Sequence, residues 1–174
     1  MADGTTEQSE AGITEIGQMN VQMLVQEIKD NQNLVLGIGG GIIAAAIGAT
    51  LWALVTVATN HQIGWMAVGV GFLVGFGVRL CGKGIDRSFG VTGAVFSLLG
   101  CFAGNLLTTC IVISRHERIP LSYLLPQLNL ETIVGLTQAT FNPMDLLFYA
   151  ISVYEGYKFS FRRISKDELA KGFK

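Results

Sequence analysis

The sequence predicts an all-α integral membrane protein: a bundle of four transmembrane helices, with an amphipathic N-terminal helix and an interfacial segment before the last span. Three observations lead to this prediction. Half of the 174 residues are hydrophobic and only 14% are charged, whereas an ordinary soluble domain carries about 25% charged residues. Glycine, which is commoner in membrane helices than in soluble ones, occurs 22 times. Long apolar runs without charge recur along the chain, as membrane spans require.

Charge and residue patterns argue against several classes of protein. The formal net charge of −1 gives nucleic-acid binding no electrostatic support. Cys81, Cys101 and Cys110 form no CxxC pair and no Cys/His cluster, so we expect neither a metal site nor another cofactor. The apolar runs contain no Ser/His/Asp set and no paired carboxylates, so we expect no enzyme activity.

The N-terminal segment, residues 1–33, is predicted to be cytoplasmic. Residues 1–12 are polar, so we expect no signal peptide at this end. Apolar residues then recur at helical spacing within residues 13–31, at Ile13, Ile16, Met23, Leu24 and Ile28. This periodicity is typical of an amphipathic helix. We expect the helix to lie on the membrane face or to dock on the bundle, and binding of a partner is the alternative.

Three apolar runs predict the first three spans, at residues 34–59, 63–80 and 89–114. As a helix the first run covers about 39 Å, more than the roughly 30 Å of a hydrocarbon core. The polar link 60–62 is so short that the first two helices must be antiparallel neighbours. A charged, glycine-rich turn, residues 81–88, joins the second span to the third.

Residues 119–141 are rich in leucine but do not predict a span. Pro120 and Pro126 interrupt the run, and proline breaks a continuous helix. We therefore expect two short helices that lie in the membrane interface, or a re-entrant segment.

A helix-start signal introduces the fourth predicted span, residues 144–161. Asn142 can cap a helix, Pro143 suits the first helical position, and Asp145 can accept backbone N–H groups. The membrane domain is thus predicted to comprise residues 34–161. A basic cytoplasmic tail, residues 162–174, follows it.

The distribution of basic residues supports four spans with both termini in the cytoplasm. In this topology the cytoplasmic basic residues are Lys29, Arg79, Lys83, Arg87, Lys158, Arg162, Arg163, Lys166, Lys171 and Lys174. Arg115 and Arg118 would lie outside, as the positive-inside rule requires. Without the fourth span, the basic tail would be on the outer side and this agreement would be lost.

Small residues at four-residue spacing mark each of the first three spans and predict close helix packing. The candidates are Gly37, Gly41 and Ala45 in the first span, Gly71 and Gly75 in the second, and Gly93, Ser97, Gly100 and Gly104 in the third. Lipid gives apolar helices no hydrophobic reason to associate, so close backbone contact must supply the attraction. Packing within one chain and formation of a homo-oligomer use the same residues, and both interpretations stay open.

Few polar side chains fall inside the predicted spans. Arg79 and Glu155 are ionisable residues near the cytoplasmic ends of their helices; each can reach the interface alone, or the two can pair. Asn105 lies deep in the third span and is expected to form an interhelical hydrogen bond, with a polar path as the alternative. Lys83 and Arg87, together with Arg79, form a basic patch that would attract anionic lipid headgroups.

Two stretches carry a family resemblance: QIGWMAVGVGFLVGFGVRLCGKGIDRSFGVTGAVFSLLGCFAGNLL, residues 62–107, and DLLFYAISVYEGYKFSFR, residues 145–162. They resemble a group of small, uncharacterised bacterial multi-span inner-membrane proteins. The resemblance implies the same architecture and a location in the bacterial inner membrane, but no activity. Some of those proteins have a zinc-ribbon-like amino terminus, and this chain has no cysteine there.

Three hypotheses for function follow. The first is a non-enzymatic membrane protein that contacts membrane lipids and either forms a homo-oligomer or serves as a subunit of a membrane complex. The second is an oligomeric channel or small-solute transporter that uses Asn105 and the glycine-rich helices. The third is a lipid-acting enzyme built on residues 119–141, where Glu131 is the sole ionisable group.

Overall fold

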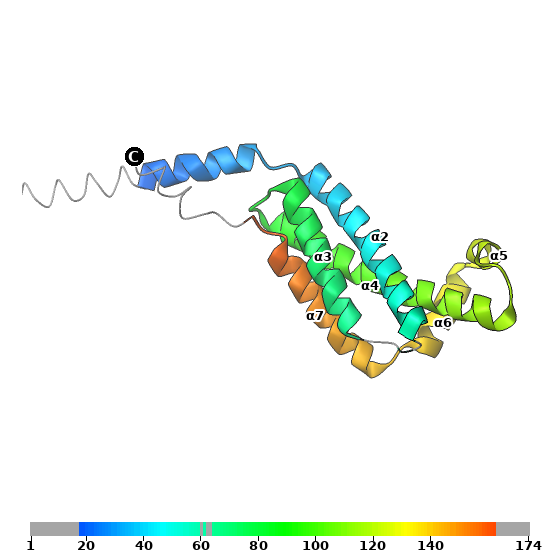
Figure 1. Cartoon of the computed structure of the whole chain (residues 1–174). Coiled ribbons are helices and arrows are strands. Elements are labelled where there is room, and N and C mark those ends of the chain that lie inside the picture. Colours follow the sequence, from blue (N-terminus) through cyan, green and yellow to red (C-terminus); the bar gives the residue numbers. More distant parts are fainter. Residues whose placement is uncertain (1–17, 60, 62–63, 163–174) are drawn as a thin grey trace, which may run out of the picture.

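The computed structural model describes residues 18–59, 61 and 64–162, and this part of the chain is helical and contains no strand (Figure 1). Residues 18–30 form a helix, called here the N-terminal helix. The predictions for residues 1–17 and for the tail from residue 163 onward lie outside the described residues. The all-helical fold class is confirmed.

Three helices are long and apolar enough to cross a membrane. They are α2 (Leu34–Thr59), α3 (Trp65–Gly82) and α4 (Arg87–Glu117). These helices indicate a membrane-embedded protein. The fourth predicted span corresponds to α7 (Pro143–Phe159), whose 17 residues cover only about 26 Å. Its membrane crossing therefore stays a prediction.

The four long helices form a bundle with α3 and α4 at its centre. Helices α3 and α4 contact each other, and both also contact α2 and α7 (Figure 1). Along α7 the buried residues are Asp145, Tyr149, Ser152 and Gly156, and Ser160 follows directly after the helix. This spacing of three to four residues gives α7 one face that packs on the bundle.

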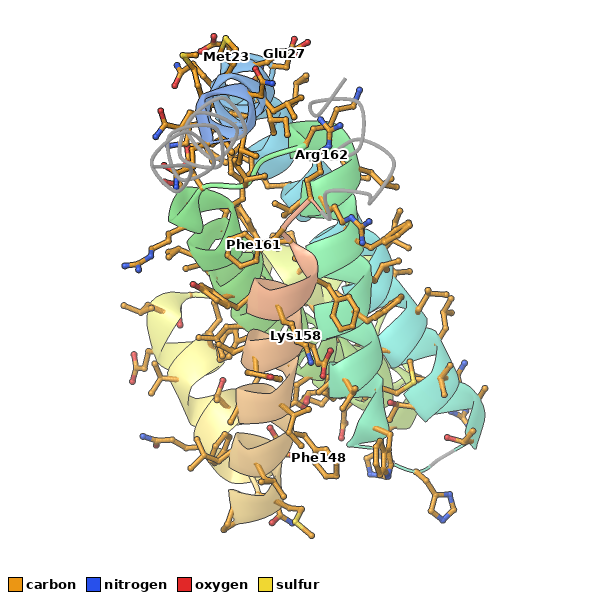
Figure 2. All side chains as sticks on the ribbon, turned by 90° about the vertical axis from the view of Figure 1, so that its left-hand side faces the viewer. Met23, Glu27, Phe148, Lys158, Phe161 and Arg162 are labelled. Carbon is orange, nitrogen blue, oxygen red and sulfur yellow. The ribbon has the colours of Figure 1, made fainter. Side chains whose placement is uncertain are left out.

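One end of the bundle carries the N-terminal helix and the end of α7. The Asn33 N–H donates to the Gly82 carbonyl at 3.0 Å, and the Arg162 N–H donates to the Gly84 carbonyl at 2.9 Å. Figure 2 shows Met23, Glu27 and Arg162 at this end and Phe148 towards the opposite end. We call the first the inner end and the second the outer end, after the predicted topology.

The outer end carries the short helices of residues 119–141. They are α5 (Leu121–Leu124), the 3₁₀ turn η1 (Leu125–Gln127) and α6 (Leu130–Thr140). Pro126 lies within η1, while Asn129 caps α6 by accepting a hydrogen bond from the Thr132 N–H at 2.7 Å. Both α5 and α6 contact α4. Residues 119–141 thus form short helices, as expected. Their position relative to a membrane stays a prediction.

Helix ends follow local chemistry more closely than hydropathy. At the start of α7, Asn142 and Asp145 form a capping box, in which the Asp145 carboxylate accepts from the Asn142 N–H at 2.9 Å. Helix α4 runs from Arg87 to Glu117, beyond both ends of the predicted 89–114. The residues by which α4 exceeds the prediction are polar. An apolar run therefore identifies the part of a helix that lipid can cover, but it does not identify the residue at which the helix ends.

Small residues let α2 approach α4 closely. A Cβ added to Gly37 would lie 3.1 Å from Phe89 Cε1, and one added to Gly41 would lie 3.0 Å from Phe96 Cδ2. A Cβ on Gly100 would lie 3.3 Å from the Ala45 Cβ. Further along, a Cβ on Gly104 would lie 3.2 Å from the Trp52 ring. Five of the predicted packing residues therefore face partners within the chain: Gly37, Gly41, Ala45, Gly100 and Gly104.

The other small residues face α7. A Cβ on Gly71 would lie 2.8 Å from the Ser152 Cα, and one on Gly75 would lie 2.9 Å from the Phe159 Cβ. A Cβ on Gly93 would meet the Gly156 backbone. Ser97 is fully buried and donates its hydroxyl proton to the Gly93 carbonyl at 2.7 Å. In this arrangement α7 packs backbone to backbone on α3 and α4.

Candidate functional site

Apart from Ser97, Ser152 and Ser160, the buried polar side chains of the described residues gather in the outer half of the bundle. They come from three helices and are each at most 8% exposed: Thr56 from α2, Asn105 and Thr108 from α4, and Asp145 and Tyr149 from α7. Polar groups buried in an apolar bundle cost free energy unless they are hydrogen-bonded. Their concentration in one region marks it as the candidate functional site.

Asn105 and Tyr149 link α4 to α7 within this site. The Tyr149 hydroxyl donates to the Cys101 carbonyl at 3.5 Å, and the Asn105 side chain interacts with the same hydroxyl. The Tyr149 ring packs edge-on against Trp52, with the ring centroids 6.4 Å apart. Asn105 therefore lies at a junction of three helices, between the aromatic core and the outer end.

A cavity of about 560 Å³ opens beside Asn105 at the outer end. Its lining residues are Thr56 and Val57 of α2, Asn105, Thr108, Thr109, Val112, Ile113, Arg115 and His116 of α4, and Thr140 of α6. Ligand pockets in proteins usually have volumes of about 300–1,000 Å³. The size of the cavity therefore suits a small molecule.

The threonines of the cavity use their hydroxyl protons within their own helices. Thr108, Thr109 and Thr140 donate to carbonyl oxygens four residues earlier, at 2.8, 3.0 and 2.8 Å. Each of these hydroxyl oxygens keeps lone pairs that can accept a hydrogen bond. Thr56 differs, because its buried Oγ1 has no hydrogen-bond partner among the described residues. The cavity wall is therefore rich in hydrogen-bond acceptors, and the Thr56 hydroxyl is buried out of reach of the cavity.

The rim of the cavity is basic. Arg115 and His116 lie in the last turn of α4, and both side chains are exposed. In the described part of the chain no ion pair joins Arg115 to an acid. Arginine binds carboxylates and phosphates through a planar fork of N–H donors. The site thus has a neutral polar floor and a cationic rim.

The structure does not pair the two ionisable residues predicted inside the spans. Arg79 and Glu155 are both half-buried. The ion pair found among residues 18–162, where these are described, joins Lys29 Nζ to Asp86 Oδ1 at 3.6 Å. Two interpretations were open for Arg79 and Glu155: pairing with each other, or reaching the interface separately. The geometry excludes pairing and leaves the second interpretation as a prediction.

Lys83 and Arg87 lie exposed at the inner turn between α3 and α4. Lys83 adopts a left-handed conformation with φ of 49°, and its N–H closes α3 by donating to the Arg79 carbonyl. Asp86 stands between the two cations, and its carboxylate is bound by Lys29 and Gln32. The basic patch predicted for lipid headgroups therefore surrounds an acid that holds the N-terminal helix.

Sequence reasoning missed most of this site. Asn105 was singled out, but Thr56, Thr108 and Thr140 were not, because a threonine in an apolar helix usually bonds to its own backbone. Arg115 was considered only in the topology, as a basic residue on the outer side. No short motif carries this signal, since the residues come from helices that are far apart in sequence.

In the described part of the chain, no group of three or more His, Cys, Asp or Glu residues is arranged to hold a metal ion. Comparison with protein-family models, curated proteins and solved structures gives no match. The resemblance to bacterial inner-membrane proteins therefore stays a prediction.

Proposed function

We propose that this chain is a non-enzymatic, four-span protein of the bacterial inner membrane that works as a subunit of a larger membrane assembly, either with copies of itself or with another protein. Both termini are cytoplasmic in this proposal. The observation that carries it is the N-terminal helix, which extends from the bundle at the inner end instead of packing along it (Figure 1).

The junction of the N-terminal helix with the bundle is made by polar contacts. Lys29 pairs with Asp86, and the Gln32 side chain donates to the same carboxylate. The Ile85 N–H donates to Gln32 Oε1 at 3.3 Å. These contacts all lie at the last turn of the N-terminal helix or just beyond it. They attach this end of the helix to the bundle and leave its earlier turns available for contact with another protein.

The earlier turns expose flexible apolar side chains. Met19 and Met23 are 55% and 58% exposed, whereas Ile28, nearer the bundle, is 8% exposed. Methionine is flexible and polarisable, and it is common at surfaces that bind other proteins. A projecting helix with two exposed methionines on a fixed base supports an assembly role.

The fourth span has independent support from charge and from packing. Asp145 is engaged in the capping box at the outer end, and Lys158 lies in the last turn at the inner end. Between them Leu146, Leu147 and Tyr154 point outward and are more than half exposed, as expected for a lipid-facing side. Crossing by α7 also places the basic tail on the cytoplasmic side, in agreement with the positive-inside rule.

Cysteine labelling in intact cells tests the topology. In a background without native cysteines, Phe141→Cys should react with a membrane-impermeant maleimide added outside. Lys166→Cys should react only after the inner membrane is permeabilised, because four spans return the tail to the cytoplasm. Labelling of both positions from outside would show that α7 does not cross.

Particle size in mild detergent tests the assembly role. The native protein is expected to run as a larger particle than one chain, and the double variant Met19→Gln, Met23→Gln should shift to a single chain. Native mass spectrometry gives the copy number and reveals any partner. The control, Gln18→Ala with Gln22→Ala, changes exposed polar residues of the same helix and should leave the particle unchanged. A native protein that runs as a monomer and retains no partner would refute the proposal.

A further inference from the structure

We propose that the outer cavity binds a small anion with a hydroxyl-bearing body, its anionic group at Arg115 and its hydroxyl groups among the threonines. This inference is independent of the assembly role, because the cavity lies at the end of the bundle opposite the N-terminal helix. Glycerol phosphate is the simplest compound of this class.

The floor of the cavity selects for hydrogen-bond donors. The oxygens of Thr108 and Thr140 already donate to their own helices and can only accept further bonds. Thr109 also lines the cavity and is only partly buried, and its hydroxyl likewise donates to its own helix, to the Asn105 carbonyl at 3.0 Å. Hydroxyl groups of a ligand in the cavity can therefore donate hydrogen bonds to these threonine oxygens.

The rim selects for negative charge. Arg115 is seven residues beyond Thr108 on the same helix, so their backbone positions lie about 10 Å apart along α4. A long arginine side chain can reach back over part of that distance. A ligand that contacts both must therefore carry its charge at one end and its hydroxyl groups a few bonds away.

The positions of the charged and polar residues in the cavity favour binding of a polar solute over binding of a lipid tail. The cationic rim is exposed, and the polar floor of Thr56, Asn105 and Thr108 is buried. Acyl chains would bring apolar surface against this polar floor without forming hydrogen bonds. Glycerol phosphate from solution fits these positions directly, while a phosphatidylglycerol headgroup offers the same phosphate and hydroxyl chemistry from the bilayer.

Calorimetric titration of the full chain in phosphatidylcholine nanodiscs tests the proposal. Glycerol 3-phosphate should bind, and inorganic phosphate should bind at least about 10-fold more weakly because it lacks the hydroxyl-bearing body. A second arm uses nanodiscs that contain phosphatidylglycerol. If the lipid headgroup is the natural source, glycerol 3-phosphate should then compete with it and its apparent affinity should fall.

Matched variants connect binding to the cavity. Thr109→Val keeps the side-chain shape and should weaken glycerol 3-phosphate binding about 10-fold, whereas Thr109→Ser should retain it. Arg115→Gln should weaken binding at least about 10-fold and reduce its dependence on salt. The controls are Thr50→Val, at an exposed threonine of α2 bonded to its own helix, and Arg118→Gln, at an exposed cation outside the lining; neither should change the affinity.

The possible outcomes are distinct. Binding in either membrane arm that both Thr109→Val and Arg115→Gln weaken supports the proposal. It is overturned if neither glycerol 3-phosphate nor phosphatidylglycerol binds, if inorganic phosphate binds equally well, or if the controls weaken binding as much as the cavity variants. Each variant is first compared with the native chain by circular dichroism, and Thr109→Ala, which also removes the hydroxyl, replaces Thr109→Val if the valine variant does not fold.

Discussion

Replacing Gly71 with alanine is expected to destabilise the bundle by about 1–3 kcal/mol, the usual cost of added volume in a well-packed core. Gly71 of α3 faces the backbone of α7, and a Cβ there would lie 2.8 Å from the Ser152 Cα. A backbone atom cannot rotate away as the end of a flexible side chain can. The added methyl group must therefore push α7 away from α3.

Gly69→Ala is the matched control for this change. Gly69 lies one half-turn away on the same helix, and a Cβ there would have no atom within 4 Å. Glycine in a helix is less favourable than alanine by about 1 kcal/mol, so this variant should be neutral or slightly stabilising. Both substitutions gain the same helix propensity, and the difference between them reports the contact with α7.

Thermal unfolding followed by circular dichroism in one detergent measures both variants. A change of this size should lower the apparent midpoint of Gly71→Ala by roughly 2–12 °C relative to the native chain. The midpoint of Gly69→Ala should stay equal or rise. Equal midpoints for the two variants would show that α7 does not pack closely on α3.

Trp52→Ala is expected to have the largest effect of a single substitution, a loss of about 3–5 kcal/mol. Trp52 is 1% exposed, packs against Tyr149, and lies under Gly104. Van der Waals contact is the main attraction between helices in lipid. Deleting this side chain leaves a large void between α2, α4 and α7, and the contacts around it are lost.

Trp52→Phe separates the volume of the ring from its N–H group. Trp52 Nε1 is buried and has no hydrogen-bond partner among residues 18–162 that the structure describes, so losing this N–H removes an unfavourable buried donor. The smaller ring loses some packing, and the two effects oppose each other. We expect a net loss below about 1.5 kcal/mol, measured by the same unfolding assay. A loss as large as that of Trp52→Ala would indicate that the N–H forms a stabilising contact.

The parts of the fold that hydropathy determines were predictable from the sequence. Helices α2, α3 and α4 occupy the predicted apolar runs, and α7 begins at the capping signal of Asn142 and Asp145. The extension of α4 to Glu117 was missed, because a helix continues beyond the apolar part wherever its polar residues can reach water. Helix starts that depend on local side chains were easier to predict than helix ends.

The spacing of the small residues did not predict which neighbouring helix each stripe packs against. Gly71 and Gly93 lie on different helices with the same small-residue pattern, and both face α7. A stripe shows that a helix has a close neighbour but does not identify it. The cavity was missed for a similar reason, since Thr56, Thr108 and Thr140 are each ordinary within their own helix and form a site only when three helices meet.

The length of α4 has a mechanical consequence. This helix has 31 residues without a break and spans about 46 Å. Its N-cap, Asp86, holds the N-terminal helix, and its last turn carries Arg115 of the cavity rim. A straight helix that packs on α2, α3 and α7 moves as one body, so a tilt caused by a partner at Met19 and Met23 would displace Arg115 relative to Thr56. Occupancy of the cavity at the outer end and assembly at the inner end of the bundle would then be coupled through the orientation of a single helix.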